Sequence, residues 1–76
     1  MLISYLPGTD VLYIRFDETL QDVINQRILD FLTFDIGKDE KIVGIEILDA
    51  KKRINLKNLL PVEYQVIPES RNNVQA

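Results

Sequence analysis

The segment with the strongest strand pattern is Lys41-Ile42-Val43-Gly44-Ile45-Glu46-Ile47-Leu48. It is rich in β-branched residues and begins with a charge, as is typical of an interior or half-buried strand. The next residues, Asp49-Ala50-Lys51-Lys52-Arg53, predict a helix start, because a capping-type Asp precedes helix-tolerant residues. A glycine inside a strand lets another group approach closely. We therefore expect Gly44 to lie under Tyr13, under Phe31 or under a partner subunit.

Two apolar segments precede this strand near the N-terminus. Residues 2–6 and 11–16 are separated by Pro7-Gly8-Thr9-Asp10, a set of residues typical of a tight turn. So short a link predicts an antiparallel hairpin. Alternation places Leu12, Ile14 and Phe16 on one face, which we expect to be the core face.

The middle of the chain predicts a second hairpin. Residues 27–36 are dense in apolar side chains, and the polar turn 37–40 connects them to the strand that begins at Lys41. Residues 17–26 leave two alternatives open. Leu20, Val23 and Ile24 have helical spacing after a Thr19 cap, but the segment is also short enough to be an irregular connection.

The C-terminal third predicts a short helix over residues 50–54, a break near Asn55, and a second turn ended by Pro61. Residues 62–67 alternate as an extended segment that could lie along a sheet edge or reach across a dimer. The predicted fold is one α+β domain over residues 1–68. It has a small antiparallel sheet of about four strands in two hairpins, followed by the short helix and the extended segment. Residues 69–76 are expected to form a mobile polar tail.

Composition narrows the function classes. The 76 residues include neither Cys nor His, which removes disulfides, thiolate metal sites, thiol nucleophiles and the usual general base. We expect no cofactor. The net charge of −3 disfavours nucleic acid as a partner. No apolar run reaches bilayer length, so we expect no membrane association. Residues 1–5 lack the basic region with which a signal peptide begins, so we expect a cytoplasmic location. A chain of this size buries only about 60 to 65 percent of its unfolded surface, which favours a homo-oligomer, most simply a dimer.

Candidate chemistry is sparse. Glu46 lies within an apolar strand, where a carboxylate can act as a general acid or base, although exposure or pairing with Arg15 or Arg27 is favoured. Four acids, at Asp30, Asp35, Asp39 and Glu40, could bind a hard cation, but a solvated turn is the favoured interpretation.

The basic segment 51–57 could contact phosphates, but in an acidic chain a solvated helix face is favoured. The aromatic residues have strand spacing and favour a packed core over a stacking platform. The residues that we select as a candidate interaction surface are Tyr13, Arg15, Glu46, Lys51, Lys52 and Arg53.

Several segments together resemble the small prokaryotic domain-of-unknown-function 2283 family (DUF2283). They are Ile3-Ser4-Tyr5, residues 10–16, Phe34-Asp35, and above all Gly44-Ile45-Glu46-Ile47-Leu48-Asp49-Ala50. The resemblance covers about residues 1–54 and implies antiparallel strands followed by a helix. It implies no activity, although some members look like partners in toxin–antitoxin gene pairs. Leu6 and Thr33 replace acids that are usual in the family, and the turn around Gly37 is longer.

We therefore interpret the chain as a noncatalytic interaction module that self-associates and that could bind a second protein in an antitoxin-like manner. The acidic balance would suit a basic, RNA-handling partner. Two alternatives remain. One is a small carboxylate- or metal-dependent enzyme using Glu46, Asp35 and Asp39, and the other is a nucleic-acid-binding module using residues 51–57. The sequence indicates neither the physiological role, nor the partner, nor the oligomer number.

Overall fold

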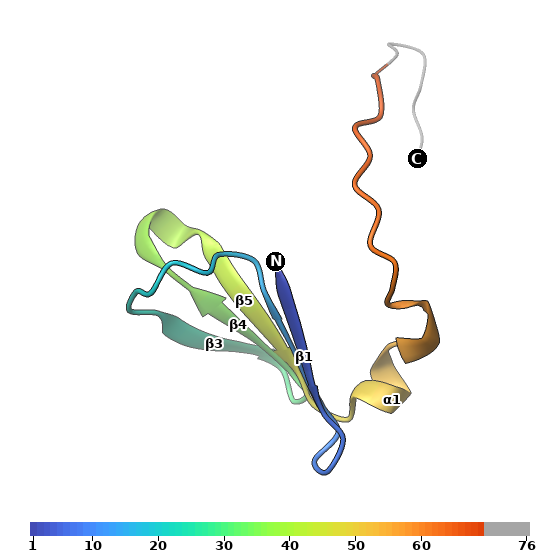
Figure 1. Cartoon of the computed structure of the whole chain (residues 1–76). Helices are drawn as coiled ribbons and strands as arrows, with labels where there is room; N and C mark the ends of the chain where they lie inside the picture. The colour runs from blue at the N-terminus through green and yellow to red at the C-terminus, as the bar shows by residue number, and fades with distance from the viewer. Residues whose placement is uncertain (70–76) are drawn as a thin grey trace.

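The computed structural model describes residues 1–69 and contains one five-stranded antiparallel sheet (Figure 1). The strand order is β1-β2-β5-β4-β3. The strands are β1 (Leu2–Leu6), β2 (Val11–Arg15), β3 (Ile24–Leu29), β4 (Leu32–Ile36) and β5 (Ile42–Ile47). Two 3-10 turns, η1 (Lys38–Glu40) and η2 (Leu56–Asn58), and one α-helix, α1 (Ala50–Arg53), complete the described elements. The strand predicted from Lys41 is β5, the centre of the sheet.

The α+β class and both expected hairpins are confirmed, but the sheet has five strands rather than about four. The single strand predicted over residues 27–36 is divided by a turn at Asp30 and Phe31, and β3 begins at Ile24. The helical alternative for residues 17–26 is therefore wrong. The Asp17 carboxylate accepts hydrogen bonds from the Thr19 backbone N–H at 2.9 Å and from Gln21 Nε2 at 3.2 Å. This local turn holds the segment as an irregular connection.

Strand register gives the sheet one apolar and one polar face. Across β1, β2, β5 and β4, one apolar row pairs Tyr5, Leu12, Ile47 and Leu32. The next row on that face pairs Ile3, Ile14, Ile45 and Phe34 in the same way. Side chains alternate along each strand, so Tyr13, Glu46 and Thr33 face the other side.

The core face predicted for the first hairpin is confirmed in its inner part. Leu12 is fully buried, and Ile14 packs against the core cluster. Phe16, expected on the same face, follows the last residue of β2 and is 47% exposed. The alternation therefore identifies the correct face, but Phe16 itself is not covered, although its neighbour Val43 is buried.

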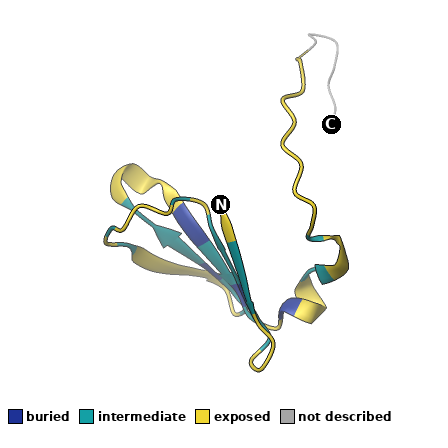
Figure 2. Cartoon of the chain, viewed as in Figure 1, coloured by how far each residue is buried: buried dark blue, intermediate teal, exposed yellow. Residues whose placement is uncertain are grey.

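The main core cluster, formed by Leu12, Ile47 and Ala50, lies at the α1 end of the apolar face. Val43, the other buried apolar residue among those described, lies apart from this cluster, near the opposite end of β5. Ile54, Leu56 and Leu59, from α1, η2 and their flanks, pack against the cluster of Leu12, Ile47 and Ala50. Helix α1 has only four residues, so most of the sheet stays half-buried or exposed (Figure 2). Within residues 1–69, no helix has the length and apolar character needed to cross a membrane.

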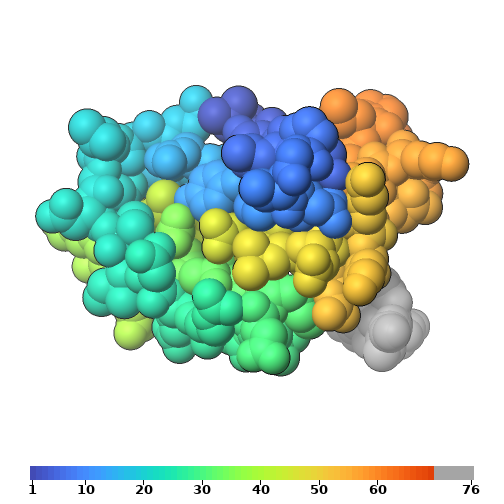
Figure 3. Space-filling model, turned by 90° about the horizontal axis from the view of Figure 1, so that it is seen from below, coloured from blue at the N-terminus to red at the C-terminus, as the bar shows by residue number. Residues whose placement is uncertain are grey.

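Asp10 fastens the first hairpin to α1. Its carboxylate accepts hydrogen bonds from Tyr5 Oη at 2.8 Å and from the Lys51 backbone N–H at 3.2 Å. Its carbonyl oxygen accepts from the Ala50 N–H at 3.0 Å. Figure 3 looks at this end, where the blue hairpin lies against the yellow chain around residue 50. The helix cap expected from Asp49 is therefore supplied by Asp10, since the Asp49 side chain makes no cap bond to a described residue.

The residues that follow η2 do not join the sheet. Residues 60–69 are all exposed, and the segment leaves η2 and runs away from the strands (Figures 1 and 2). Residues 62–67 form neither helix nor strand, and the segment does not lie along an edge of its own sheet. The mobile polar tail was predicted over residues 69–76, and all of these residues except Glu69 lie outside the described part of the chain.

Replacing Asp10 with Gly should lower the free energy of unfolding by about 1 to 2 kcal/mol, because the Tyr5 and Lys51 hydrogen bonds are lost. Asp10 has a positive φ of 59°, which glycine adopts without strain, so the change isolates the carboxylate. Asp39→Gly is the matched control, since Asp39 has the same φ and makes no side-chain hydrogen bond to a described residue. Urea denaturation measures both, and equal losses would contradict the role given to Asp10.

Candidate functional site

The polar face of the sheet carries two neighbouring rows of side chains. The first row pairs Tyr13, Glu46, Thr33 and Arg27 across β2, β5, β4 and β3. The second row pairs Arg15, Gly44, Asp35 and Asn25 across the same strands. A hollow of about 340 Å³ lies over both rows. We call it the polar-face site, and it is lined by Tyr13, Asn25, Arg27, Thr33, Asp35 and Glu46.

Gly44 gives the polar-face site its shape. A Cβ atom at Gly44 would collide with Oη and Cζ of Tyr13, so the phenol ring occupies the place of the missing side chain. From there Tyr13 Oη donates a hydrogen bond of 2.6 Å to Asp35 Oδ2. Of the three groups expected over Gly44, the structure therefore selects Tyr13. The contact joins β2 to β4 across the central strand.

Asp35 is held from two sides. Its second oxygen, Oδ1, accepts a short hydrogen bond from Asn25 Nδ2 on β3. Burial and the neighbouring Asp35 carboxylate raise the pKa of Tyr13 above its ordinary value, while the Arg15 guanidinium acts in the opposite direction. The Arg15 guanidinium lies 5.7 Å from the centre of the Tyr13 ring. Tyr13 consequently remains a protonated donor throughout the neutral pH range, and the network is fixed.

Glu46 lies half-buried between Tyr13 and Thr33. Pairing with Arg15 or Arg27 was one expectation from the sequence, but within residues 1–69 Glu46 forms no ion pair with either. Arg27 instead donates from Nη1 to the Asp30 carbonyl oxygen at 2.6 Å. The Glu46 carboxylate therefore offers an acceptor in the lining of the polar-face site.

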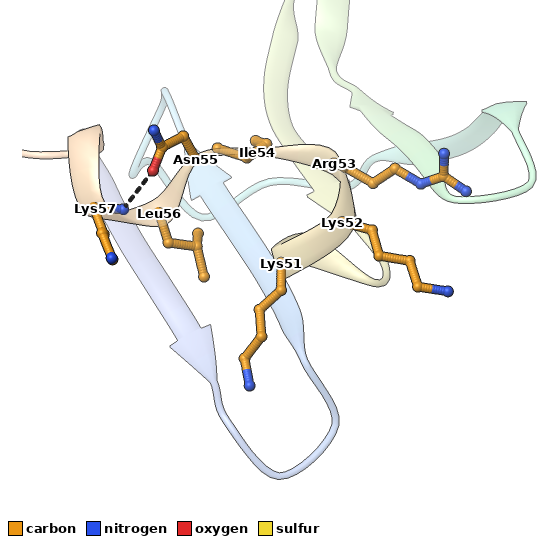
Figure 4. A pocket seen from close by; sticks show the side chains of 7 residues that line it. All are labelled: Lys51, Lys52, Arg53, Ile54, Asn55, Leu56 and Lys57. Carbon is orange, nitrogen blue, oxygen red and sulfur yellow. Dashed lines mark hydrogen bonds between the residues drawn. The ribbon is translucent and has the colours of Figure 1, made fainter.

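The candidate basic residues lie elsewhere, on α1. Lys51, Lys52 and Arg53 line a separate hollow of about 490 Å³ together with residues 54–57. Figure 4 shows Lys52 and Arg53 directed away from Lys51 and Lys57, so the four cations do not converge on one anion. The Arg53 guanidinium lies 3.8 Å from the centre of the Phe31 ring, a cation–π contact that fastens α1 to the β3–β4 turn.

The six candidate residues thus form two groups. Tyr13, Arg15 and Glu46 come together on the polar face, whereas the three basic residues belong to the α1 end. The acids near residues 30–40 also separate, because Asp35 lies in the polar-face site while Asp39 and Glu40 lie on the loop before β5. Among residues 1–69, no three His, Cys, Asp or Glu side chains are grouped so that they could hold a metal ion.

Sequence reasoning missed Asn25 and Thr33. Thr33 is 9% exposed, the one buried polar residue among those described, and it faces Glu46. Both residues belong to the β3–β4 hairpin. Thr33 lies in the segment 27–36, which was predicted as a single strand, and Asn25 lies in the segment 17–26, for which a helix or an irregular connection was expected. A hairpin turn at Asp30 would have placed Asn25 beside Asp35 and Arg27 beside Thr33.

Gly44→Ala should lower the free energy of unfolding by about 1 to 3 kcal/mol, because the added methyl displaces the Tyr13 ring from Asp35. The cost should shrink in a Tyr13→Ala background, since the blocking ring is then absent. Gly8→Ala is the matched control, with no atom within 4 Å of its added Cβ. A double-mutant cycle by urea denaturation measures the coupling, and strict additivity would contradict the packing described.

Tyr13 should also contribute a pH-dependent part of the stability. Because its folded pKa is raised, the contribution is present below about pH 10 and is lost as the pH rises through the raised pKa. Tyr13→Phe should therefore show a smaller alkaline decline in unfolding free energy than the wild type. A residual decline is expected from Tyr5, whose pKa the hydrogen bond to Asp10 raises. Identical alkaline slopes for the two proteins would rule out this role for Tyr13.

Comparison with known proteins adds a family and no activity. Residues 2–51 match the family model described as a protein of unknown function (DUF2283). Neither the curated proteins nor the solved structures contain a match to the chain. The matched residues include all five strands and the start of α1, and therefore the whole polar-face site. By the extent of this match, the chain belongs to the DUF2283 family.

Proposed function

We propose that this protein is a noncatalytic interaction module that forms a homodimer through the apolar face of its sheet. The supporting observation is the poor cover of that face. Ile14, Ile45 and Phe34 occupy its centre, yet each is only half-buried. Towards the end far from α1, Ile24 pairs with Ile36 and is 72% exposed.

The surface area of the chain supports the same proposal. The chain exposes 6425 Å², whereas a folded monomer of 8.8 kDa is expected to expose about 4,800 Å². The difference exceeds the roughly 800 Å² that each partner contributes to a standard protein interface, and the exposed segment 60–69 after η2 accounts for part of it. Burying one further large apolar side chain contributes about 1.5 to 3 kcal/mol. A second copy could therefore supply the core that one chain lacks.

The polar-face site remains free in such a dimer, since it lies on the opposite side of the sheet. Its fixed Tyr13–Asp35–Asn25 network presents hydrogen-bonding groups without further loss of side-chain freedom. If the protein binds a second protein in an antitoxin-like manner, this is the surface that we assign to that partner. The Glu46 carboxylate would suit a basic group on it.

Ile24→Lys should weaken self-association by about tenfold or more without unfolding the chain, because the side chain is largely exposed in the monomer. Leu6→Lys is the matched control, because Leu6 is 53% exposed and lies on the polar face. Sedimentation equilibrium measures the populations of monomer and dimer. Equal effects of the two changes, or a wild type that stays monomeric, would refute the dimer face.

A further pair of variants tests the second-protein proposal in material purified from the native host. A second protein that copurifies in stoichiometric amount should be retained by Ile24→Lys, which alters only the apolar face. It should be lost from the double variant Arg15→Ala/Glu46→Ala, which leaves the apolar face intact. Retention of that protein by the double variant would remove the polar-face site from the proposal.

A further inference from the structure

We propose that the segment 61–67, here called the C-terminal arm, lies on the apolar sheet face of a second copy of this chain. This inference rests on the proposed function, because it requires a homodimer. Beyond the homodimer itself, it specifies which segment crosses between the two copies and which surface of the partner receives that segment.

The arm carries apolar side chains that are left in water. Val62 is 52% exposed, Tyr64 90% and Val66 79%. These three residues alternate with Glu63, Gln65 and Ile67, so an extended arm presents one wholly apolar side and one side that is polar except at Ile67. An apolar row of this kind is stabilised only when another surface removes it from water.

The receiving surface is the part of the apolar face that α1 and η2 leave open. At the end of the sheet far from α1, a hollow of about 470 Å³ has the apolar residues Val23, Ile24 and Ile36 in its lining. The polar residues Gln21, Asp22 and Lys38 also line it. The apolar row of the arm suits the apolar part of this lining, and Glu63 and Gln65 suit its polar part.

The dimensions of the arm also fit. Seven extended residues span roughly 23 Å, and the five strands of the sheet span roughly 19 Å from first to last at the usual spacing. The arm can therefore cross the whole sheet of a partner. Its own sheet is not the receiver, because the arm runs away from it (Figure 1).

A second copy is the occupant that these observations favour, because the same chain carries both the uncovered face and the uncovered arm. A twofold dimer uses each surface twice, so both arms and both faces are covered at once. The surface that the chain exposes beyond the expectation for its mass, about 1,600 Å², is large enough for such an exchange.

Serine substitutions in the full-length protein test the arm directly. Tyr64→Ser/Val66→Ser should raise the dimer dissociation constant by about tenfold or more, because the apolar row is removed. Glu63→Ser/Gln65→Ser changes the alternate residues of the same arm and should raise it less than the first pair does. Equal effects would overturn the inference.

Cysteine cross-linking tests the contact itself, since the chain contains no Cys of its own. One full-length copy carries Val66→Cys and a second, tagged copy carries Ile24→Cys. After mixing and mild oxidation, a disulfide between the two copies is expected. The control pair is Val66→Cys with Leu6→Cys, which lies on the polar face and should not cross-link.

The outcomes separate this inference from the proposed function. A stable dimer that is weakened by Ile24→Lys but not by Tyr64→Ser/Val66→Ser, without the Val66–Ile24 cross-link, would overturn the arm and leave the dimer face standing. A monomeric wild type would overturn both. A monomer whose arm variants lose a bound second protein would show that the occupant is a different chain, and would overturn the inference as well.

Discussion

The apolar side of β5 has to be removed from water, and the chain supplies a helix of only four residues to do so. Leu12, Ile47 and Ala50 form the one well-covered cluster at the α1 end of the described chain. Beyond it, the apolar face continues across the sheet with only partial cover from residues 1–69, except at Val43, which is buried. The case for a second copy follows from this shortage of covering structure.

The contacts that hold α1 in place show how a small chain stabilises a fold that has little covering structure. Asp10 binds both Tyr5 and the backbone of Lys51, so the first turn fixes the start of the helix. Arg53 stacks on Phe31 and fixes the other hairpin to the end of the helix. The basic residues of α1 therefore include one with a structural role, which weakens the interpretation of this segment as a phosphate-binding surface.

On the polar face, the absence of a side chain at Gly44 allows an ordered hydrogen-bond network to form. Gly44 allows Tyr13 to lie across β5 and reach Asp35, which also binds Asn25. Hydrogen bonds between side chains thus link three strands over a surface that also presents Glu46 and two arginines. Such a face can be recognised by a partner without rearranging, whereas the apolar face is suited to permanent cover.

Much of this fold could be predicted from the sequence pattern, because a strong alternation of apolar and polar residues indicates which face of a strand is buried. The hairpin of β1 and β2, the central position of β5, the short helix and the role of Gly44 follow from such signals. β3 was missed as a separate strand because it is an exposed edge strand in which Asn25, Gln26 and Arg27 interrupt the apolar pattern. The cap from Asp10 was missed because it joins residues 41 positions apart, a contact that no local pattern encodes.

The most direct test of the central claim is the molar mass of the purified full-length protein, measured by light scattering over a wide dilution series. The account predicts twice the 8.8 kDa chain mass at high concentration, with dissociation only on dilution. A mass of one chain at every concentration, with the fold intact by circular dichroism, would contradict it.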